Sequence, residues 1–423
     1  MQIKRFIIDN DGTNLFVLKS PLTEADLQWT VNQCPKSVTT YMVCPNIIGK
    51  FCYPCSVGEP LPKEVAPHLI DAFERGEDYF GKLLTLLKQS GKEVFVTYRM
   101  NDVHNANDSD HWGISEFKKR NPELTVDPKA TKAGTGDWMS YCLDYSKKQV
   151  QNYVISSLKD IVDKYDIDGI QLDWMRFPRH LSGNSPQEVW EKRHALTEFS
   201  YSVRNMLDKL GQSRGKKILL SARIPTWLEG CKRLGVDVKE WHKIIDFITV
   251  APFLSCDYHI NFSEFRELFP EKPIYAGTDM NHSGRCHNSE SYRAWALCMF
   301  DQGADGINIF NFPCWTEYLA EQPYDWIADI SDEESIKNKS ALYTLISNYY
   351  RVPNIDQFGI LPIKIDPNNV KDAEAMKREP EVKDCCSFIV PDDQFKAGEN
   401  VLSFTNIDNK EINISRVDLG IWY

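Results

Sequence analysis

Several features are missing from this sequence, and each absence argues against a class of function. No apolar run reaches the roughly 18 residues of a membrane-spanning helix. The 49 Lys and Arg are outnumbered by 60 Asp and Glu, and the net charge of −11 argues against a nucleic-acid partner. The start lacks a signal-peptide pattern. We therefore expect a cytoplasmic protein, or a secreted one if a leader has been removed.

Three catalytic signatures are also missing. No G-x-G-x-x-G follows the first predicted strand, which removes the main support for a dinucleotide site. No H-E-x-x-H zinc motif occurs, and no lysine stands at a strand end where a Schiff-base enzyme would need it. We therefore expect neither a cofactor nor a metal.

The twelve cysteines form no disulfide framework. Cys52-Tyr-Pro-Cys55 is a lone C-x-x-C, and a zinc or redox role for it would need partner residues in a specific context. Free thiols in a reducing compartment are the favoured interpretation.

Eight short apolar segments alternate with stretches of helical periodicity. The expected strands are Arg5–Asp9, Thr40–Cys44, Lys92–Tyr98, Asp168–Asp173, Lys217–Ile224, Asp246–Ala251, Lys272–Gly277 and Asp305–Phe310. The expected helices include Thr23–Val31, Lys63–Gln89, Val150–Ile161, Pro186–Leu210 and Ser289–Gln302. This alternation predicts an α/β fold, a closed (β/α)8 TIM barrel over residues 1–350. Residues 351–423 contain short strand-like segments and predict a small β-rich accessory region.

The active site of such a barrel lies at the carboxyl ends of its strands. The stretch 168–178, DGIQLDWMRFP, is a buried strand that ends in an acid, an indole and a guanidinium, namely Asp173, Trp174 and Arg176. The other strand ends supply further candidates for substrate binding: Asn10, Asp11, Tyr98, Arg99, Asp102, His104, Arg223, Asp257 and Asn311. The polar stretch from Arg99 to Tyr145 is predicted to be a lid or substrate loop, because long structureless connections are usually functional.

Paired carboxylates beside aromatic rings suit glycoside hydrolysis, in which one acid protonates the leaving oxygen and another attacks or activates water. Asp173 is the first catalytic candidate, and Asp279 is the second because strands four and seven lie across the barrel mouth. Asp257 and Glu229 are reserves. A simpler role for Asp173, capping of the helix that follows its strand, stays open.

The remaining candidates each have two interpretations. Arg176 and Arg223 would hold an acidic sugar substituent or form structural ion pairs, and His104 would move a proton, donate to substrate or do neither. Trp112, Trp138, Trp174 and Trp315 would serve as sugar platforms or pack in the core.

The stretch 168–178 resembles the strand-four signature of glycosyl-hydrolase-like (β/α)8 barrels, the family-10-like glycosyl hydrolases. Three further stretches resemble the same barrels: RMNDVH at 99–104 with Glu116-Phe117 and 121–124, YAGTD at 275–279 with 292–294, and GADGI at 303–307 with Phe310-Asn311. The resemblance covers roughly residues 1–330 and implies a glycoside hydrolase with Asp173 as a catalytic acid and a second acid near Asp279. Relatives often carry Glu at the latter position, whereas α-galactosidase-like barrels place the partner after strand six, which keeps Asp257 open.

Two other functions compete with a hydrolase of a poly- or oligosaccharide. A non-catalytic carbohydrate-binding barrel would need the aromatic side chains but not the acids. A metal-dependent barrel hydrolase would use His104, Asp11 and Asp173.

Overall fold

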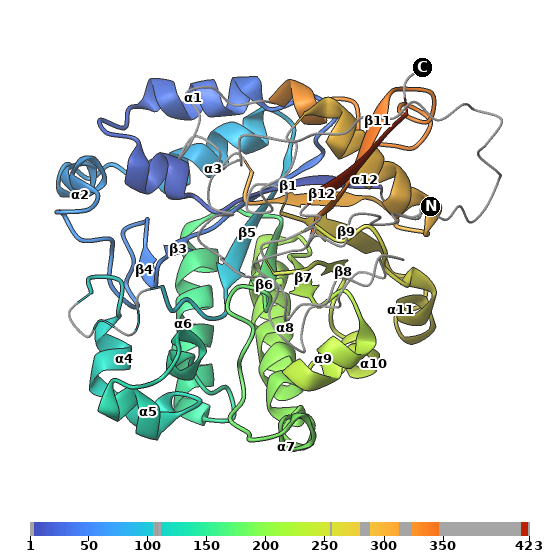
Figure 1. The fold of residues 1–423 in the computed structure, drawn as a ribbon. Helices are drawn as coiled ribbons and strands as arrows, with labels where there is room; N and C mark the ends of the chain where they lie inside the picture. The colour runs from blue at the N-terminus through green and yellow to red at the C-terminus, as the bar shows by residue number, and fades with distance from the viewer. Residues whose placement is uncertain are drawn as a thin grey trace, which may run out of the picture.

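The computed structural model describes residues 4–104, 106, 108, 111–253, 256–279, 288–312, 324–346 and 416–421, with the backbone alone for 344–346 and 416–421. Within these residues eight parallel strands close into a barrel in the order β1-β10-β9-β8-β7-β6-β5-β2 (Figure 1). They are β1 Phe6–Asn10, β2 Thr40–Val43, β5 Glu93–Arg99, β6 Gly169–Asp173, β7 Leu219–Ile224, β8 Phe247–Val250, β9 Ile274–Thr278 and β10 Ile307–Phe310. The predicted TIM barrel is confirmed, strand for strand.

Helices cover the outside of the barrel. They are α1 Glu24–Gln33, α2 Pro67–Glu74, α3 Tyr79–Gln89, α6 Lys148–Lys164, α7 Pro186–Glu191, α8 His194–Arg214, α9 Leu228–Leu234, α10 Val238–Trp241, α11 Phe262–Leu268 and α12 Ser289–Asp301. In α6 the apolar residues at i, i+4 spacing, Val150, Val154 and Leu158, are all buried against the strands. Shorter elements are η1 Asn14–Leu18, β3 Asn46–Ile47, β4 Lys50–Phe51 and η6 Tyr324–Ile327.

Two helices expected to be continuous are each divided in two. The helix expected over 63–89 is interrupted after α2, where Gly76 adopts a φ of +78° that a helix cannot continue through. Asp78 then caps α3 by accepting a hydrogen bond from the Gly81 amide at 3.0 Å. The helix expected over 186–210 divides between α7 and α8, and its second part continues to Arg214.

The polar stretch 99–145 is not the structureless loop that its composition predicts. It contains α4 Glu116–Arg120, η2 Pro122–Leu124, α5 Pro128–Ala133 and η3 Trp138–Tyr141. Ser115, Asp127 and Asp137 each cap the helix that follows with a side-chain oxygen. These local hydrogen bonds allow a polar sequence to form short helices. The periodicity of apolar residues does not detect such helices.

The interior of the barrel changes from apolar to polar toward the carboxyl ends of its strands. Near the amino ends a buried cluster joins Ile7, Met42, Phe95, Phe247 and Tyr275. Side chains alternate along a strand, so the residues two positions further on share the inward face. Those residues include Asp9, Thr97, Thr249 and Gly277, and the polar ones among them are fully buried or nearly so. The fold therefore places a buried polar layer directly beneath the mouth of the barrel.

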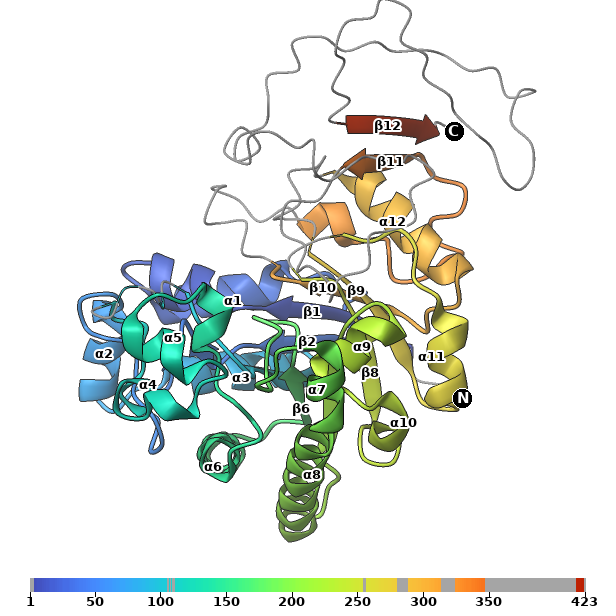
Figure 2. The same ribbon diagram turned by 60° about the horizontal axis from the view of Figure 1, so that its bottom comes forward.

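Beyond the barrel, β11 Ala341–Ile346 pairs antiparallel with β12 Arg416–Ile421, with Ala341 opposite Ile421. Figure 2 shows this pair beside α12, at the opposite end of the view from α8. Most of the region 351–423 lies outside the described residues, so the division at residue 350 stays a prediction. Within the described ranges, no helix is both long enough and apolar enough to cross a bilayer.

Candidate active site

Asp173 and Arg223 form a buried ion pair at the mouth of the barrel. They end the adjacent strands β6 and β7 and stand opposite each other in the register. Arg223 Nη1 lies 3.1 Å from Asp173 Oδ1, and each side chain is 1 % exposed. Asp173 Oδ1 also accepts hydrogen bonds from the amides of Met175 and Arg176, at 2.9 and 3.1 Å. The carboxylate thus shapes the turn after its strand, and its Oδ2 is the less occupied oxygen.

Arg223 is fixed by two further contacts. Its Nη2 donates to the carbonyl oxygen of Pro252 at 2.9 Å. Its guanidinium carbon lies 3.9 Å from the centre of the Phe310 ring, at the end of β10. The guanidinium therefore spans the mouth from β7 toward β10 and holds Asp173 in one orientation.

A second ion-pair cluster joins the ends of β1 and β5. Arg99 Nη1 lies 2.6 Å from Asp102 Oδ2, and its Nη2 lies 3.1 Å from Asp11 Oδ2. All three side chains are at most 5 % exposed. Burial alone would raise the pKa of Asp102, but its interactions with the hydrogen-bonded His104 ring and with the positive charge of Arg99 outweigh burial and hold that pKa well below its usual range. Asp102 is therefore an ionised anchor for the residues around it.

His104 connects this cluster to Arg176. Its Nδ1 lies 2.6 Å from Asp102 Oδ1, and its Nε2 lies 3.2 Å from Arg176 Nη2. A guanidinium can only donate, so Nε2 accepts and the ring proton is on Nδ1. Burial lowers the pKa of His104, which agrees with this neutral tautomer. The sequence prediction that Arg99, Asp102, His104 and Arg176 meet at the mouth thus corresponds to one connected cluster.

Asp9 is a site residue that the sequence analysis missed, because the search began at Asn10 after the strand. It is fully buried inside the barrel, where its Oδ2 accepts a hydrogen bond from Gln171 Nε2 at 2.7 Å. Burial, followed by the negative charge of Asp173, raises its pKa to about 7. The alternation of side chains along β1 could have identified Asp9 from the sequence, because it places Asp9 on the same inward face as Ile7.

The raised pKa of Asp9 predicts a change in how stability depends on pH. Between about pH 4 and pH 7 the folded state holds a proton that the unfolded state has released, so stability falls as the pH rises. The rise from 3.8 to about 7 corresponds to about 4 kcal/mol across this range. We expect Asp9→Asn to remove this decrease. The free energy of unfolding of the variant, relative to that of the wild type, should therefore be higher at pH 8 than at pH 5.

Denaturant unfolding at the two pH values measures this effect. Asp163→Asn on α6 is the matched control, because the Asp163 side chain is 43 % exposed and should leave the pH dependence unchanged. Equal pH dependence in Asp9→Asn and the wild type would mean that Asp9 titrates at an ordinary pKa.

The other predicted acids also lie at the mouth. Asp279 follows β9 and is fully buried, and its negative charge acts on Arg176 from across the barrel. Asp257 follows β8 and is 1 % exposed, with Thr226 Oγ1 lying 3.2 Å from its Oδ2. Asn311 is buried after β10 and has a φ of +59°, the left-handed conformation that asparagine tolerates better than most residues.

Three predicted substrate contacts face away from the mouth. Trp174 is fully buried and packs edge-on against Tyr145 and His180, so it is a core residue and not a sugar platform. Tyr98 points outward from β5, where its ring lies 6.4 Å from that of Phe51. Asn10 Nδ2 donates to the Tyr41 hydroxyl, and its Oδ1 accepts from the Gly12 amide. Trp174 and Asn10 therefore support the walls of the site.

Among the other tryptophans, Trp138 is the one that fits an exposed platform. Its side chain is 41 % exposed, and its ring lies 6.2 Å from His104 and 6.3 Å from Phe177. Trp112 is half-buried and stacks on His111, and Trp315 lies outside the described residues.

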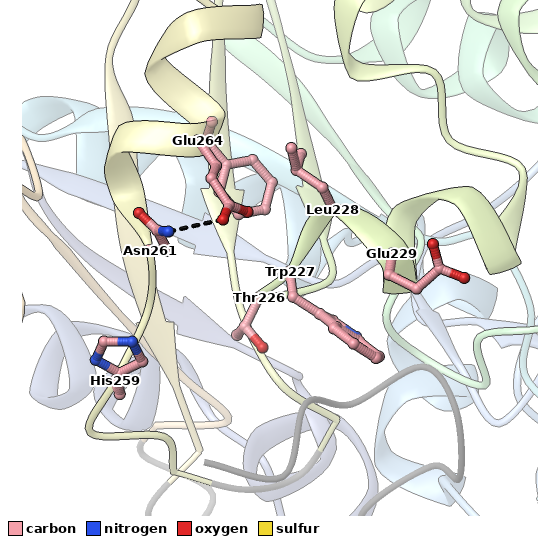
Figure 3. Close-up of a pocket in the computed structure, with 8 residues that line it drawn as sticks. Thr226, Trp227, Leu228, Glu229, His259, Asn261 and Glu264 are labelled. Atoms are coloured by element: carbon pink, nitrogen blue, oxygen red, sulfur yellow. Dashed lines mark hydrogen bonds between the residues drawn. The ribbon is translucent and has the colours of Figure 1, made fainter. Parts of the chain in front are cut away.

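A pocket with a volume of about 250 Å³ lies between the segments that follow β7 and β8. Figure 3 shows the residues that line it. Its floor includes Thr226, which links it to Asp257. His259, Asn261 and Glu264 lie on one side of Trp227 in this view, and the Glu229 carboxylate lies on the other. Glu229 pairs with Arg233 at 3.0 Å on α9, so this reserve acid borders the pocket and has a partner on its own helix.

The described residues contain no group of three or more His, Cys, Asp or Glu side chains arranged to hold a metal ion. The three ligands of the metal-dependent alternative each face a different partner: Arg99 for Asp11, Asp102 for His104 and Arg223 for Asp173. Cys52 and Cys55 are free thiols, and burial raises the pKa of each, which favours the simple interpretation of this pair.

Comparison with known families identifies one match within the barrel. The profile described as "Glycosyl hydrolases family 18" matches residues 114–310, a little under half of the chain, from the insertion after β5 to the end of β10. This part of the barrel is therefore similar in sequence to glycosyl hydrolases of family 18. The resemblance noted at strand four is confirmed at the level of glycosyl-hydrolase-like (β/α)8 barrels, and the family that matches is 18 and not specifically 10.

Two curated proteins match a short part of the chain. The 1,4-alpha-glucan branching enzyme GlgB of Mycobacterium ulcerans is 26 % identical over 113 residues, which are 27 % of this chain and 15 % of that protein. The GlgB of Photobacterium profundum is 26 % identical over 99 residues, 23 % of this chain and 14 % of that protein. The chain thus spans about a seventh of the length of these relatives.

Among solved structures, the PgaB (BpsB) glycoside hydrolase domain from Bordetella bronchiseptica superposes with a TM-score of 0.52 at 10 % identity. It covers 78 % of this chain and 99 % of that domain, and supports the same barrel fold. A family 18 N-acetylglucosaminidase from Paenibacillus barengoltzii superposes more loosely, with a TM-score of 0.42 at 11 % identity, covering 77 % of this chain and 99 % of that one.

Proposed function

We propose that this protein is a glycoside hydrolase that cleaves a glycosidic bond in a poly- or oligosaccharide. The observation that carries the proposal is the concentration of buried aspartates at the carboxyl ends of the strands, in a barrel related to glycosyl hydrolases of family 18. Active sites of (β/α)8 enzymes lie at this face. Most glycoside hydrolases use two carboxyl groups with different roles.

Asp173 and Asp279 are the proposed catalytic pair. Asp173 ends β6 and Asp279 follows β9, two strands that are separated by β7 and β8 in the ring, so both acids lie at the same mouth. Arg223 holds Asp173 in place, and the less occupied Oδ2 is the oxygen available to substrate. Asp257, one strand closer to β6, is the alternative partner.

The proposed substrate contacts come from the cluster around His104. Arg99, Asp11 and Asp102 fix the imidazole, and His104 presents a neutral ring whose side chain is 24 % exposed. The half-exposed Trp138 beside it offers the face on which a pyranose ring stacks. A sugar would therefore enter between Trp138 and the aspartates of the mouth.

The test is release of reducing ends from a broad glycan panel by the wild type, Asp279→Asn and Asp257→Asn. We expect the wild type to cleave at least one glycan and Asp279→Asn to lose about 10²-fold or more of that rate, since a positioned acid or base contributes this much. Asp257→Asn should retain most of the rate. The opposite ranking would transfer the second role to Asp257, and no cleavage of any glycan would contradict the hydrolase.

A non-catalytic carbohydrate-binding barrel is the second candidate, and one observation favours it. Oδ1 of Asp173 is already occupied by two backbone amides and Arg223, as in a structural turn. Calorimetric titration with the same glycans separates the two functions. Sustained heat from turnover identifies a hydrolase, whereas saturable heat without released ends identifies a binding protein.

A further inference from the structure

Among the described residues, three arginines lie at the mouth, and one of them differs from the other two in having no anionic partner there. Arg99 pairs with Asp11 and Asp102, and Arg223 pairs with Asp173. Arg176 is 5 % exposed, yet no carboxylate in the described part of the chain forms an ion pair with it. Its Nε and Nη1 are buried and have no hydrogen-bond partner among the residues that the structure describes.

Within the described residues, the hydrogen-bond partner of the Arg176 side chain is uncharged. Nη2 donates to His104 Nε2 at 3.2 Å, and the geometry of His104 makes that ring neutral. The guanidinium also lies over the Phe177 ring, 5.5 Å from its centre. A buried cation without an ion pair is costly for a protein to maintain. Such a cost persists where the charge has a function.

The carboxylates near Arg176 do not form an ion pair with it in the described part of the chain, because another arginine already holds two of them. The negative charges of Asp102, Asp11 and Asp279 act on Arg176, but Arg99 already occupies the first two carboxylates at 2.6 and 3.1 Å. The backbone amide of Arg176 is fixed on Asp173 at 3.1 Å, so the side chain begins from the floor of the proposed catalytic site.

We propose that Arg176 binds an anionic substituent of the sugar substrate, a carboxylate or a sulfate ester. This inference rests on the proposed carbohydrate function and names the class of sugar. The ligand's anion accepts hydrogen bonds from the two unpartnered N–H groups of Arg176, and its pyranose ring lies toward Trp138, on the exposed side of His104.

Binding of monosaccharides tests this site independently of catalysis, because they contain no bond for the enzyme to cut. Glucuronate, glucose 6-sulfate and neutral glucose are titrated calorimetrically into the wild type, Arg176→Gln and Arg120→Gln. Arg120 is the matched control because its side chain is 77 % exposed on α4. We expect the wild type to bind at least one anionic sugar about tenfold or more tighter than glucose.

Arg176→Gln should lose this preference, and Arg120→Gln should keep it. The two anionic sugars distinguish a carboxylate from a sulfate. The inference is overturned if the wild type binds all three sugars equally or binds none, or if Arg176→Gln keeps the preference. If binding depends on Arg176 but no glycan is cleaved, the result supports the anion site and contradicts only the hydrolase proposal.

Thermal unfolding provides a second measurement, for which a purely structural role of Arg176 predicts the opposite result. Removal of an unpaired buried charge relieves its desolvation cost, so the melting temperature of Arg176→Gln should equal or exceed that of the wild type. A lower melting temperature would assign Arg176 to the fold and overturn the inference.

Discussion

Replacement of Asp173 by asparagine is expected to lower the rate of glycan cleavage by at least about 10²-fold. Asparagine keeps an oxygen for the amides of Met175 and Arg176, which the carboxylate binds at 2.9 and 3.1 Å. It cannot carry the negative charge or transfer a proton. The turn after β6 is therefore retained while the proposed chemistry is lost, and reducing-end release from the best glycan measures the effect.

Asp168→Asn is the matched control for this prediction. Asp168 immediately precedes the same strand, but at the amino end of the barrel, where its Oδ2 accepts from the Val94 amide at 2.9 Å. Substitutions at that face affect stability and not chemistry. Equal rates for Asp173→Asn and the wild type, with both proteins folded, would restrict Asp173 to a structural role.

The largest loss of stability is expected for Arg223→Met. This change leaves the carboxylate of Asp173 buried at 1 % exposure without its cation, which costs about 3–5 kcal/mol. It also removes the hydrogen bond to Pro252 and the contact with the Phe310 ring. Denaturant unfolding should show a lower midpoint with an unchanged slope, because the surface exposed on unfolding is the same.

Arg193→Met is a closely matched control for Arg223→Met. Arg193 pairs with Asp237 at 3.2 Å, lies 4.5 Å from the Trp190 ring centre and donates to a backbone carbonyl oxygen, but its side chain is 39 % exposed. Solvent screening limits such a pair to about 0–1 kcal/mol. The double variant Asp173→Asn, Arg223→Met should lose less than the sum of the single changes. Additive losses would show that the two side chains do not stabilise each other.

The sequence predicted the barrel because its strands carry local signals. Each segment is short and apolar, is bounded by a turn or a proline, and alternates with a helical stretch, as in DGIQLD at 168–173. The same logic located Asp173, Arg176, Arg223, Asp257 and Asp279 near one mouth, because parallel strands present their carboxyl ends at one face. The prediction from periodicity was wrong where side-chain caps decide the structure, as in the folded insertion from 99 to 145 and at the break between α2 and α3.

By itself the sequence determined which residues reach the mouth, since strand order and alternation are properties of the chain. Only the tertiary structure decided what each residue does there, because partners come from segments distant in sequence. It paired Arg223 with Asp173 across 50 positions and left Arg176 with a neutral histidine 72 positions away. It also buried Trp174 in the core and raised the pKa of Asp9 by enclosing it near Asp173. Burial and the distances between charges determine these roles, and neither can be read from the amino-acid sequence alone.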